Sequence, residues 1–481
     1  MRIDNEWLSV AMTASETQAD QRTERTAYGK SYRREVPLES HAAVPAPAER
    51  ADPVDLLEQQ ATERVPSLVP IRYGRMLVSP FTFYRGAALI MATDLGAVRR
   101  TELTAQLCGD AHVSNFGLFA STERRLVFDL NDFDETLPGP FEWDVKRLAA
   151  SVELAGRDNG VSDKRRAEIV RACVKNYRET MRAFAKDSTL NVWYARLDVD
   201  EILASGDGLK TKRARRTATE QANKARGRDR TQALRKFTTE QDGEVRIVHD
   251  PPLVVPISEL PEVADPQAVL EQINSQLKSY LATLTPERRQ VLGQFHAIDA
   301  AHKVVGVGSV GTRAWIVLME GAARDDAFLL QVKQAQSSVL ETVLGPATQD
   351  EHGERVVLGQ RLMQVAGDPF LGWKRMPAIL GNETSVDYYL RQLRDWKGSL
   401  PIDEMTPTGL GIYAKACAWT LARAHARTGD RFAIAGYLGK SEAFDHAITD
   451  FATAYADLND SDYHALEEAV SSGRVRAQTG V

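Results

Sequence analysis

The sequence predicts an α+β fold that combines a larger helical lobe with a small antiparallel sheet. Apolar residues recur every three or four positions in residues 143–152 and 168–184, which is the spacing of a helix packed on one face. Three short apolar runs follow one another between residues 304 and 333, with glycines at the first turn, which is typical of neighbouring antiparallel strands. From residue 386 the helical spacing returns and continues almost to the end of the chain.

Composition limits the partners and the compartment. The 481 residues exceed the usual size of one domain, so we expect two lobes or domains. A net charge of -6 with 43% hydrophobic and 26% charged residues is typical of a soluble globular protein and indicates no polyanionic partner. Three widely spaced cysteines argue against a disulfide framework and a clustered zinc site. With no recognisable membrane span or signal peptide, we expect a cytoplasmic protein without a membrane partner.

The first segment of the chain is polar. Residues 1–54, which include an Ala/Pro-rich stretch at 42–50, are expected to form a disordered leader without a catalytic role. A periodic pattern begins at about Asp55, and we expect a helical catalytic lobe over residues 55–300.

The segment most suited to chemistry lies in this lobe. It reads Cys-Gly-Asp-Ala-His-Val-Ser-Asn over residues 108–115, and the apolar runs 116–119 and 126–130 after it predict a hairpin. Phosphate chemistry needs one carboxylate to orient or deprotonate a hydroxyl and an amide oxygen to help hold magnesium. Asp110 and Asn115 supply these two groups.

A cluster of carboxylates belongs to the end of the hairpin. Asp129, Asp132, Asp134 and Glu135 would repel one another unless a cation joins them. We therefore predict that Asn115 and Asp132 bind a metal ion, with Asp129 or Asp134 as a further ligand. The alternative is a solvated acidic loop, and Gly-Asp and Ser-Asn pairs are also common in turns.

A basic insertion occupies about residues 205–240. Residues 210–236 carry many Lys and Arg against Glu220 and Asp229 alone. This segment is either a contact for phosphate or nucleic acid, or a solvated helix or mobile insertion. Few aromatic residues are present to stack on bases, so we favour the second interpretation and expect no nucleic-acid partner. A helical region at 266–296 follows.

A glycine-rich turn follows the helical region. Gly306, Gly308 and Gly311 form a G-x-G-x-x-G pattern that also contains Ser309. A dinucleotide-binding fold would need this pattern to open a helix, but residues 315–318 are strand-like. A glycine-rich turn between antiparallel strands, with a lysine on the third strand, is instead the arrangement of protein kinases, where the turn covers the nucleotide phosphates.

Lys333 is the lysine in question. It stands in Leu-Gln-Val-Lys, much like the kinase Val-Ala-Ile-Lys strand, and Glu341 in the expected next helix would pair with it. The alternative for Lys333 is a surface position at a strand end. Residues 356–365 predict one or two more strands, so we expect a nucleotide lobe at 301–380 and helices that complete the catalytic lobe at 381–481.

The parts of a kinase are present in an unusual order, because the catalytic half precedes the nucleotide half. Circular permutation allows this order, since it preserves spatial contacts when the old termini lie close together. The predicted helix at 413–426 resembles the Leu-Ala-x-Leu-His helix that runs directly into the catalytic loop of aminoglycoside and choline kinases. Here that helix ends at Gly429 without the loop.

Residues 108–115, named the catalytic segment for the role expected of them, also resemble these small-molecule kinases. Residues 109–115 are similar to their His-Gly-Asp-Leu-His-x-x-Asn motif, with Cys108 in place of the first His, and residues 132–134 are similar to Ile-Asp-Phe-x-Asp. Residues 139–145 resemble Asp-Pro-x-x-Asp-Leu-Ala, which puts Asp144 where those enzymes have an aspartate that braces the catalytic loop. The resemblance implies a circularly permuted, protein-kinase-like fold with two lobes.

Over most of its length the chain also resembles an uncharacterised bacterial family, domain of unknown function 2252. The resemblance rests on the runs SPFTFYRG, CGDAHVSNFG, FDLNDFDETLPGPFEWDVKRLAAS and LARAHARTGD. It identifies no substrate.

We expect an ATP- and Mg²⁺-dependent kinase-like phosphotransferase that acts on a hydroxyl group of a small molecule. Asp110 would orient or deprotonate the hydroxyl, and Lys333 with the glycine turn would bind the nucleotide. The alternatives are a metal-dependent hydrolase that uses Asp110, His112 and the acidic cluster, and a pseudokinase-like nucleotide-binding module. Adenylyl transfer is a further option on this architecture. His112 is expected to pack the loop, and Arg85 either binds a carboxylate or phosphate or braces the acidic cluster.

Overall fold

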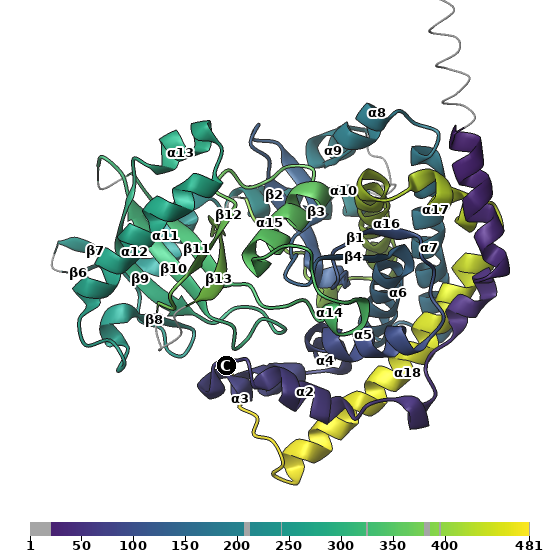
Figure 1. Cartoon of the computed structure of the whole chain (residues 1–481), viewed down its shortest axis with the longest axis horizontal. Helices are drawn as coiled ribbons and strands as arrows, with labels where there is room; N and C mark the ends of the chain where they lie inside the picture. Colours follow the sequence, from purple (N-terminus) through teal and green to yellow (C-terminus); the bar gives the residue numbers. More distant parts are fainter. Residues whose placement is uncertain are drawn as a thin grey trace, which may run out of the picture.

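The computed structural model describes residues 21–205, 212–241, 243–323, 326–379, 385–393 and 396–480. Figure 1 shows two lobes, with an antiparallel sheet and its covering helices on the left and a bundle of helices on the right. The α+β class predicted from the sequence is confirmed. Among the described helices, none combines the length and the apolar composition that crossing a bilayer requires.

Six strands in the described part of the chain form the main sheet, and they are antiparallel throughout. Their spatial order is β12 (Gly372–Met376), β13 (Val386–Gln392), β11 (Ala327–Gln334), β10 (Ala314–Glu320), β9 (His296–Lys303) and β8 (Val254–Pro256). The glycine turn at residues 304–313 joins β9 to β10. The second and third of the three expected strands are present as β10 and β11, whereas the first lies at His296–Lys303, before the apolar run at 304–310, which belongs to the turn.

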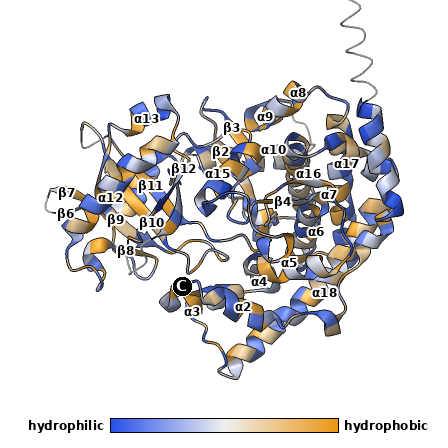
Figure 2. Ribbon diagram, in the orientation of Figure 1, coloured by the Kyte–Doolittle hydropathy of each residue, from blue (hydrophilic) through white to orange (hydrophobic). Residues whose placement is uncertain are grey.

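Strand β10 is a continuous apolar run because the sheet is covered on both faces. Trp315 and Val317 pack toward α12 (Pro266–Tyr280), and Ile316 packs on the other face toward α11 (Arg230–Phe237). Figure 2 shows the hydrophobic β10 and β11 among these helices. The smaller elements of this lobe are α13 (Pro286–Leu292) and the hairpin of β6 (Thr238–Gln241) and β7 (Glu244–Ile247).

The helical lobe contains long helices with small side chains at their contacts. Ala414, Cys417 and Ala418 are fully buried, which lets their helix approach its neighbour closely enough for Cys173 Sγ to donate to Ala414 O at 3.3 Å. The main helices are α6 (Phe141–Asp158), α7 (Asp163–Phe184), α16 (Pro407–Thr428), α17 (Arg431–Leu438) and α18 (Ala443–Ser471).

Four short helices precede the catalytic segment, and in Figure 1 the first two lie near the lower edge of the molecule with the other two above them. They are α2 (Pro53–Ala61), α3 (Val69–Met76), α4 (Pro80–Gly86) and α5 (Ala88–Ala97). Ser79 fixes the start of α4, because its Oγ accepts the Thr82 N–H while Thr82 Oγ1 accepts the Ser79 N–H.

The predicted hairpin is present. Strand β2 (Phe116–Ala120) pairs with β3 (Leu126–Leu130), so that Phe116 lies opposite Leu130, and β5 (Leu197–Asp198) extends the pair. Strands β1 (Thr104–Leu107) and β4 (Leu137–Pro140) form a second antiparallel pair on either side of the catalytic segment.

The prediction of a disordered leader differs from the structure between residues 21 and 54. Residues 21–31 are helical, and the following short turns place Val36 and Leu38 in the main core. Tyr437 of α17 holds this segment, since its hydroxyl donates to Val36 O at 2.9 Å and lies 2.7 Å from His41 Nε2. The few apolar side chains of the segment are widely spaced, so the composition resembled that of disorder. Residues 1–20 lie outside the described residues.

Two further predictions are wrong. Residues 356–365 were expected in strands, but His352–Met363 form α15, with Val356, Gln360 and Met363 buried at helical spacing. The adjacent valines suggested a strand, and packing of one helical face overrides that preference. Helical structure was expected from residue 386, yet β13 occupies Val386–Gln392, so the sheet lobe extends beyond the expected range of 301–380 on both sides.

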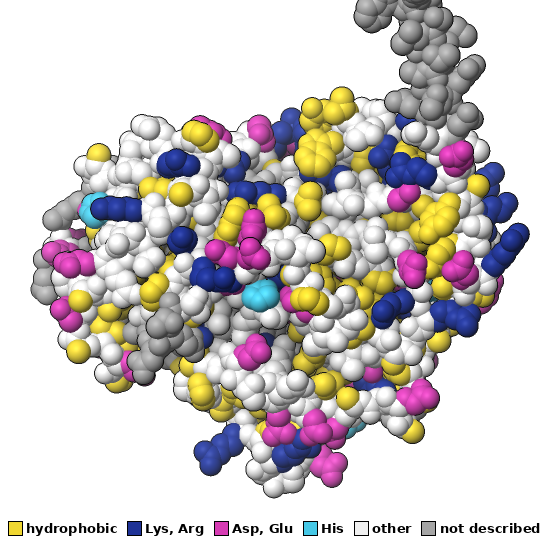
Figure 3. Space-filling model, viewed as in Figure 1, with side chains coloured by type: hydrophobic (Ala, Val, Ile, Leu, Met, Phe, Trp, Pro, Cys, Tyr) yellow, Lys and Arg dark blue, Asp and Glu magenta, His cyan; other side chains and the backbone are white. Residues whose placement is uncertain are grey.

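The basic insertion is largely helical where it is described. Helix α10 (Lys212–Arg226) buries Ala222 and Ala225 and exposes most of its charged residues, as expected of a solvated helix. The remaining short helices are α8 (Thr189–Tyr194), α9 (Val199–Ser205) and α14 (Glu341–Leu344). Figure 3 shows a hydrophobic patch at the top of the molecule over α8, where Trp193 and Tyr194 are exposed.

Candidate active site

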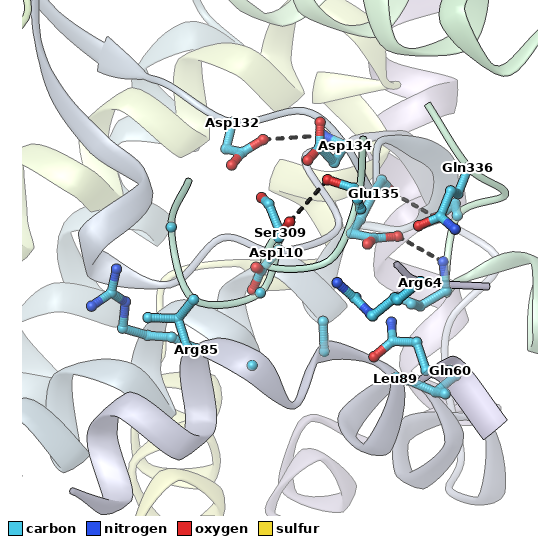
Figure 4. Close-up of a pocket in the computed structure, with 18 of the residues that line it drawn as sticks. Gln60, Arg64, Arg85, Leu89, Asp110, Asp132, Asp134, Glu135, Ser309 and Gln336 are labelled. Atoms are coloured by element: carbon cyan, nitrogen blue, oxygen red, sulfur yellow. Dashed lines mark hydrogen bonds between the residues drawn. The ribbon is translucent and has the colours of Figure 1, made fainter. Parts of the chain in front are cut away.

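A cavity of about 220 Å³ lies between the catalytic segment, the glycine turn and the short helices α2–α5. Figure 4 shows its residues, with Asp132 and Asp134 at the top of the view and Asp110 between Arg85 and Arg64. Of the residues named in the sequence analysis, those that line the cavity are Arg85, Asp110, His112, Asn115, Asp132, Asp134, Glu135, Gly306, Gly308 and Ser309. The structure therefore brings together two segments that are far apart in the chain.

One carboxylate holds the loop that carries Asp110. Asp144, in the first turn of α6, accepts the N–H of Cys108 at 2.7 Å and that of Gly109 at 3.0 Å. His425 Nε2 of α16 lies 3.3 Å from the same carboxylate. Gly109 has a φ of 81°, and a Cβ there would lie 2.2 Å from Glu135 O, so the loop requires glycine at this position. These contacts match the bracing role that the kinase resemblance implies for Asp144.

Asp110 is held in its ionised form. Its Oδ1 accepts a hydrogen bond from Arg147 Nε at 2.8 Å, and His112 Nε2 lies 3.5 Å from Oδ2. Burial raises the pKa of Asp110, but the neighbouring His112 and the charges of Arg147 and Arg85, with the hydrogen bond from Arg147, outweigh burial and lower it. Burial also lowers the pKa of His112 to about 3, so its ring is neutral at pH 7 and the two arginines maintain the carboxylate.

The amide of Asn115 has a defined orientation. Its Nδ2 donates to the backbone O of Asp110 at 2.8 Å, which leaves Oδ1 as the atom that can bind a further ligand. The residue ends the single turn η5 (Val113–Asn115) and lines the cavity. An oxygen ligand next to Asp110 is therefore available for a hard cation.

Lys333 joins the two halves of the site. Its Nζ is ion-paired with Asp134, from which it is 199 positions distant in the chain, and donates to Ser309 Oγ at 3.0 Å. Tyr389 OH donates to the other Asp134 oxygen at 2.7 Å. Burial lowers the pKa of Lys333, but the charges of Asp132 and Asp134 raise it well above its usual value. The lysine is therefore a fixed positive charge between the glycine turn and the acidic cluster.

Asp132 and Asp134 respond differently to this lysine. Asp132 Oδ1 accepts the N–H of Asp134 at 3.3 Å. Burial and the negative charge of Asp134 raise the pKa of Asp132. Burial also raises the pKa of Asp134, but the charge and hydrogen bond of Lys333 offset this and lower it. Asp132 is thus the carboxylate that a further cation would stabilise.

The glycine turn is fastened to the segment before α3. Gly306 and Gly311 have φ angles of 68° and 93°, which favour glycine. Arg64 Nη1 donates to Val310 O at 2.6 Å, and the Val65 N–H donates to Gly311 O at 2.8 Å. These bonds hold the turn over the cavity.

Four of the predicted residues do not line the cavity. Gly311 lies in the glycine turn beside Arg64, and Lys333 contacts the lining residues Ser309 and Asp134. Asp129 and Glu341 are placed elsewhere. Asp129 does not line the cavity, because its carboxylate is paired with Arg423 at 2.5 Å and accepts the N–H of Val365 at 2.8 Å. Glu341 does not pair with Lys333. It accepts the N–H of Ser338 at 2.9 Å and lies 3.7 Å from Arg355 Nε. In the described part of the chain, no three His, Cys, Asp or Glu side chains are close enough to form a metal site by themselves.

Arg147, Arg64 and Arg72 were not predicted as site residues, whereas Glu135 and Arg85 were named in the sequence analysis. Arg147 lies one helical turn after Asp144, so helical spacing could have placed it on the same side of α6. Glu135 lines the cavity, and burial raises its pKa to about 7. Arg64 and Arg72 also line it, although their sequence surroundings carry no recognisable motif. Arg85 lines it too, and its buried Nε has no partner among the described residues.

One protein family matches most of the chain. The model of a family described as an uncharacterised protein conserved in bacteria (DUF2252) matches residues 64–469, a stretch that contains both lobes and nearly all of the cavity. Neither a curated protein nor a solved structure matches the chain significantly.

Proposed function

Since the chain belongs to the DUF2252 family of uncharacterised bacterial proteins, we propose its function from the chemistry of the cavity. The protein is an ATP- and magnesium-dependent phosphotransferase with a circularly permuted, kinase-like fold. Its acceptor is a hydroxyl group of a small molecule.

The position of Lys333 carries this proposal. A buried lysine on the third strand contacts Ser309 of the glycine turn on one side and Asp134 of the acidic cluster on the other. Kinases need these parts together, because the turn covers the phosphates, the lysine binds them and an aspartate in the next hairpin holds the metal. Nothing in a simple turn or a solvated acidic loop would require a buried lysine at this junction.

The end of α16 supports the permuted arrangement. Thr428 Oγ1 accepts the N–H of Gln106 at 3.2 Å, and a Cβ on Gly429 would lie 2.7 Å from Thr104 O. The helix therefore ends against β1, the strand that leads to the loop carrying Asp110. In the small-molecule kinases that the chain resembles, the corresponding helix runs directly into that loop.

Asp110 orients the acceptor hydroxyl. Its lowered pKa keeps it ionised at neutral pH, so it accepts a hydrogen bond from the hydroxyl group without a prior proton transfer. A strong base is not needed when the transition state is loose, because the proton leaves late. Arg147 fixes the direction of the carboxylate through the bond to Oδ1.

The residues present fit a magnesium ion that also binds nucleotide phosphates. Asp132 and Asn115 Oδ1 would hold it, because both are hard oxygen ligands and the raised pKa of Asp132 indicates a carboxylate short of positive charge. When bound, the ion would neutralise charge on the phosphate oxygens. Asp134 is a weaker candidate, since Lys333 and Tyr389 already occupy its two oxygens.

A thermal-shift experiment tests nucleotide binding. ATP with Mg²⁺ should raise the unfolding midpoint of the wild type, whereas Lys333→Met and Asp132→Asn should lose this shift. Lys175→Met is the matched control, because Lys175 is a half-exposed lysine of α7 that is paired with Glu442 outside the cavity. No shift with the wild type would refute the proposal.

Turnover separates a transferase from a binding module. The wild type, incubated with γ-labelled ATP and a cell extract, should produce a labelled small molecule, and Asp110→Asn should bind the nucleotide without forming this product. Label that appears only when the α-phosphate is marked would show adenylyl transfer instead. Nucleotide binding without any consumption would indicate the pseudokinase-like alternative.

A further inference from the structure

Two buried arginines form one wall of the cavity. Arg64 precedes the turn η4 (Pro66–Leu68), and Arg72 lies on α3. Arg64 is 7% exposed and Arg72 is 0% exposed. Figure 4 shows Arg64 on the opposite side of Asp110 from Arg85.

The partners of these two arginines are neutral oxygens. Arg72 Nη2 donates to Gln60 Oε1 at 2.5 Å and to Gly86 O at 2.9 Å, and Arg64 Nη1 donates to Val310 O at 2.6 Å. The buried Nε of both side chains and Nη1 of Arg72 have no hydrogen-bond partner among the described residues. Buried donors are rarely left in this state, because each one costs free energy unless a ligand satisfies it.

The positive charges of Arg64 and Arg72 also lack a direct negative partner. No carboxylate of the described residues forms an ion pair with Arg64 or Arg72. Glu135 acts on both arginines, and Asp134 and Glu63 act on Arg64, only at longer range. Burial lowers the pKa of Arg72, and the neighbouring charge of Arg64 lowers it further. Arginine nevertheless stays protonated in proteins. Two adjacent guanidinium groups with open donors therefore lack an anion.

We propose that Arg64 and Arg72 form an oxyanion subsite for the acceptor. The acceptor is then a hydroxyl compound that also carries a phosphate or carboxylate group. Its anionic group binds the two guanidinium groups, and its hydroxyl reaches Asp110 in the same cavity. This assignment of a substrate class rests on the proposed transferase function. Lys333 and Ser309 remain the contacts for the phosphates of the nucleotide.

Inorganic phosphate is the probe for the subsite. Calorimetric titration of phosphate into the full chain, saturated with Mg²⁺ and a non-hydrolysable ATP analogue, should show binding by the wild type. Arg64→Gln and Arg72→Gln should each weaken this binding about tenfold or more, because each removes charged donors of the subsite. Arg165→Gln should bind like the wild type, since Arg165 is a half-exposed arginine of α7 that is paired with Glu168.

The outcomes separate the subsite from the nucleotide site. The proposal is overturned if phosphate binds both glutamine variants as tightly as the wild type, or binds none of the proteins. It is also overturned if the analogue displaces phosphate, or if Arg72→Gln loses the analogue together with phosphate, because the arginines would then belong to the nucleotide site. If Arg72→Gln does not fold, Arg64→Gln and the charge-retaining Arg72→Lys decide the question, and Arg72→Lys should bind phosphate more weakly than the wild type.

The failure of the proposed function would look different. In that case the wild type would not bind the ATP analogue, while phosphate titrated alone would still bind the wild type and not Arg72→Gln. This result would show that the two arginines form an anion-binding site in a protein that does not bind ATP.

Discussion

Replacing Asp144 with asparagine is expected to loosen the loop that carries Asp110. The carboxylate of Asp144 accepts two buried N–H groups, from Cys108 and Gly109. Asparagine has a single acceptor oxygen, and its NH₂ group would face the second N–H. One buried donor is therefore left without an acceptor in Asp144→Asn.

The cost follows from these two hydrogen bonds. A buried donor without a partner costs about 1–3 kcal/mol, and a hydrogen bond to a charged group contributes about 1.5–3 kcal/mol, part of which the neutral amide loses. We expect the free energy of unfolding to fall by about 2–5 kcal/mol in Asp144→Asn. This loss of stability is large for a substitution that exchanges a single carboxylate oxygen for an NH₂ group.

Urea unfolding with linear extrapolation measures this loss. Asp163→Asn is the control, because Asp163 stands in the same type of helical first turn, on α7, with its side chain 96% exposed, and it should stay within about 0.5 kcal/mol of the wild type. Hydrogen exchange of the Cys108 and Gly109 amides should also accelerate in Asp144→Asn. A loss below about 1 kcal/mol together with unchanged exchange of these amides would refute the bracing role.

Three further predictions concern stability. Asp129→Asn breaks the buried pair with Arg423 and should lower the free energy of unfolding by about 3–5 kcal/mol, measured in urea. Because Asp129 lies outside the cavity lining, calorimetry should show unchanged Mg-ATP affinity of the folded variant, and a large loss of affinity would restore Asp129 as a metal ligand. Burial lowers the pKa of Lys146 from 10.5 to about 8. Between these pH values Lys146 is protonated in the unfolded chain and neutral in the folded protein, so the stability of the wild type rises with pH. Lys146→Met should therefore be more stable than the wild type below pH 8, by up to about 3 kcal/mol, and this difference should disappear above about pH 10.5. A variant that is less stable than the wild type at pH 7 would contradict the reasoning. Gly311→Ala should lower stability by about 1–3 kcal/mol, through its φ of 93° and a new Cβ 3.0 Å from Arg64 Cβ. Gly345→Ala, with a φ of 87° and open space around the new Cβ, should lower stability less than Gly311→Ala when both variants are unfolded thermally. Equal losses of stability would exclude a contribution from the contact with Arg64.

Local patterns in the sequence were sufficient for the parts of the fold that depend on neighbouring residues. The hairpin of β2 and β3 was predicted because both apolar runs and the turn lie within fifteen residues, Phe116–Leu130. Strand β10 was recognisable because burial on both faces produces an unbroken apolar run. Asp110, Asn115 and Asp132 were identified because they belong to two short motifs, residues 109–115 and 132–134, and all three line the cavity.

The remaining parts depend on contacts between distant segments. The partner of Lys333 was expected at Glu341, within reach along the chain, but the structure pairs Lys333 with Asp134 across 199 positions. Asp129 resembled its acidic neighbours in sequence, and only the position of Arg423 on α16 removes it from the cavity. Arg64 and Arg72 look like ordinary surface residues in sequence, because nothing local shows that Arg64 bonds to the glycine turn or that Arg72 bonds to Gln60 and Gly86.

The order of the two halves has a consequence for how the chain acquires its structure during synthesis. The partner of Asp129, Arg423, is synthesised 294 positions later, and the partner of Asp144, His425, is synthesised 281 positions later. At about 5–20 residues per second, a ribosome needs roughly 15–60 s to make the intervening stretch. During this time the catalytic loop has been made while α16, against which it packs, has not. The nascent chain would therefore expose buried charges and apolar surface for longer than a chain in which this helix and loop follow each other in sequence. It is expected to depend more strongly on chaperones that hold unfinished chains.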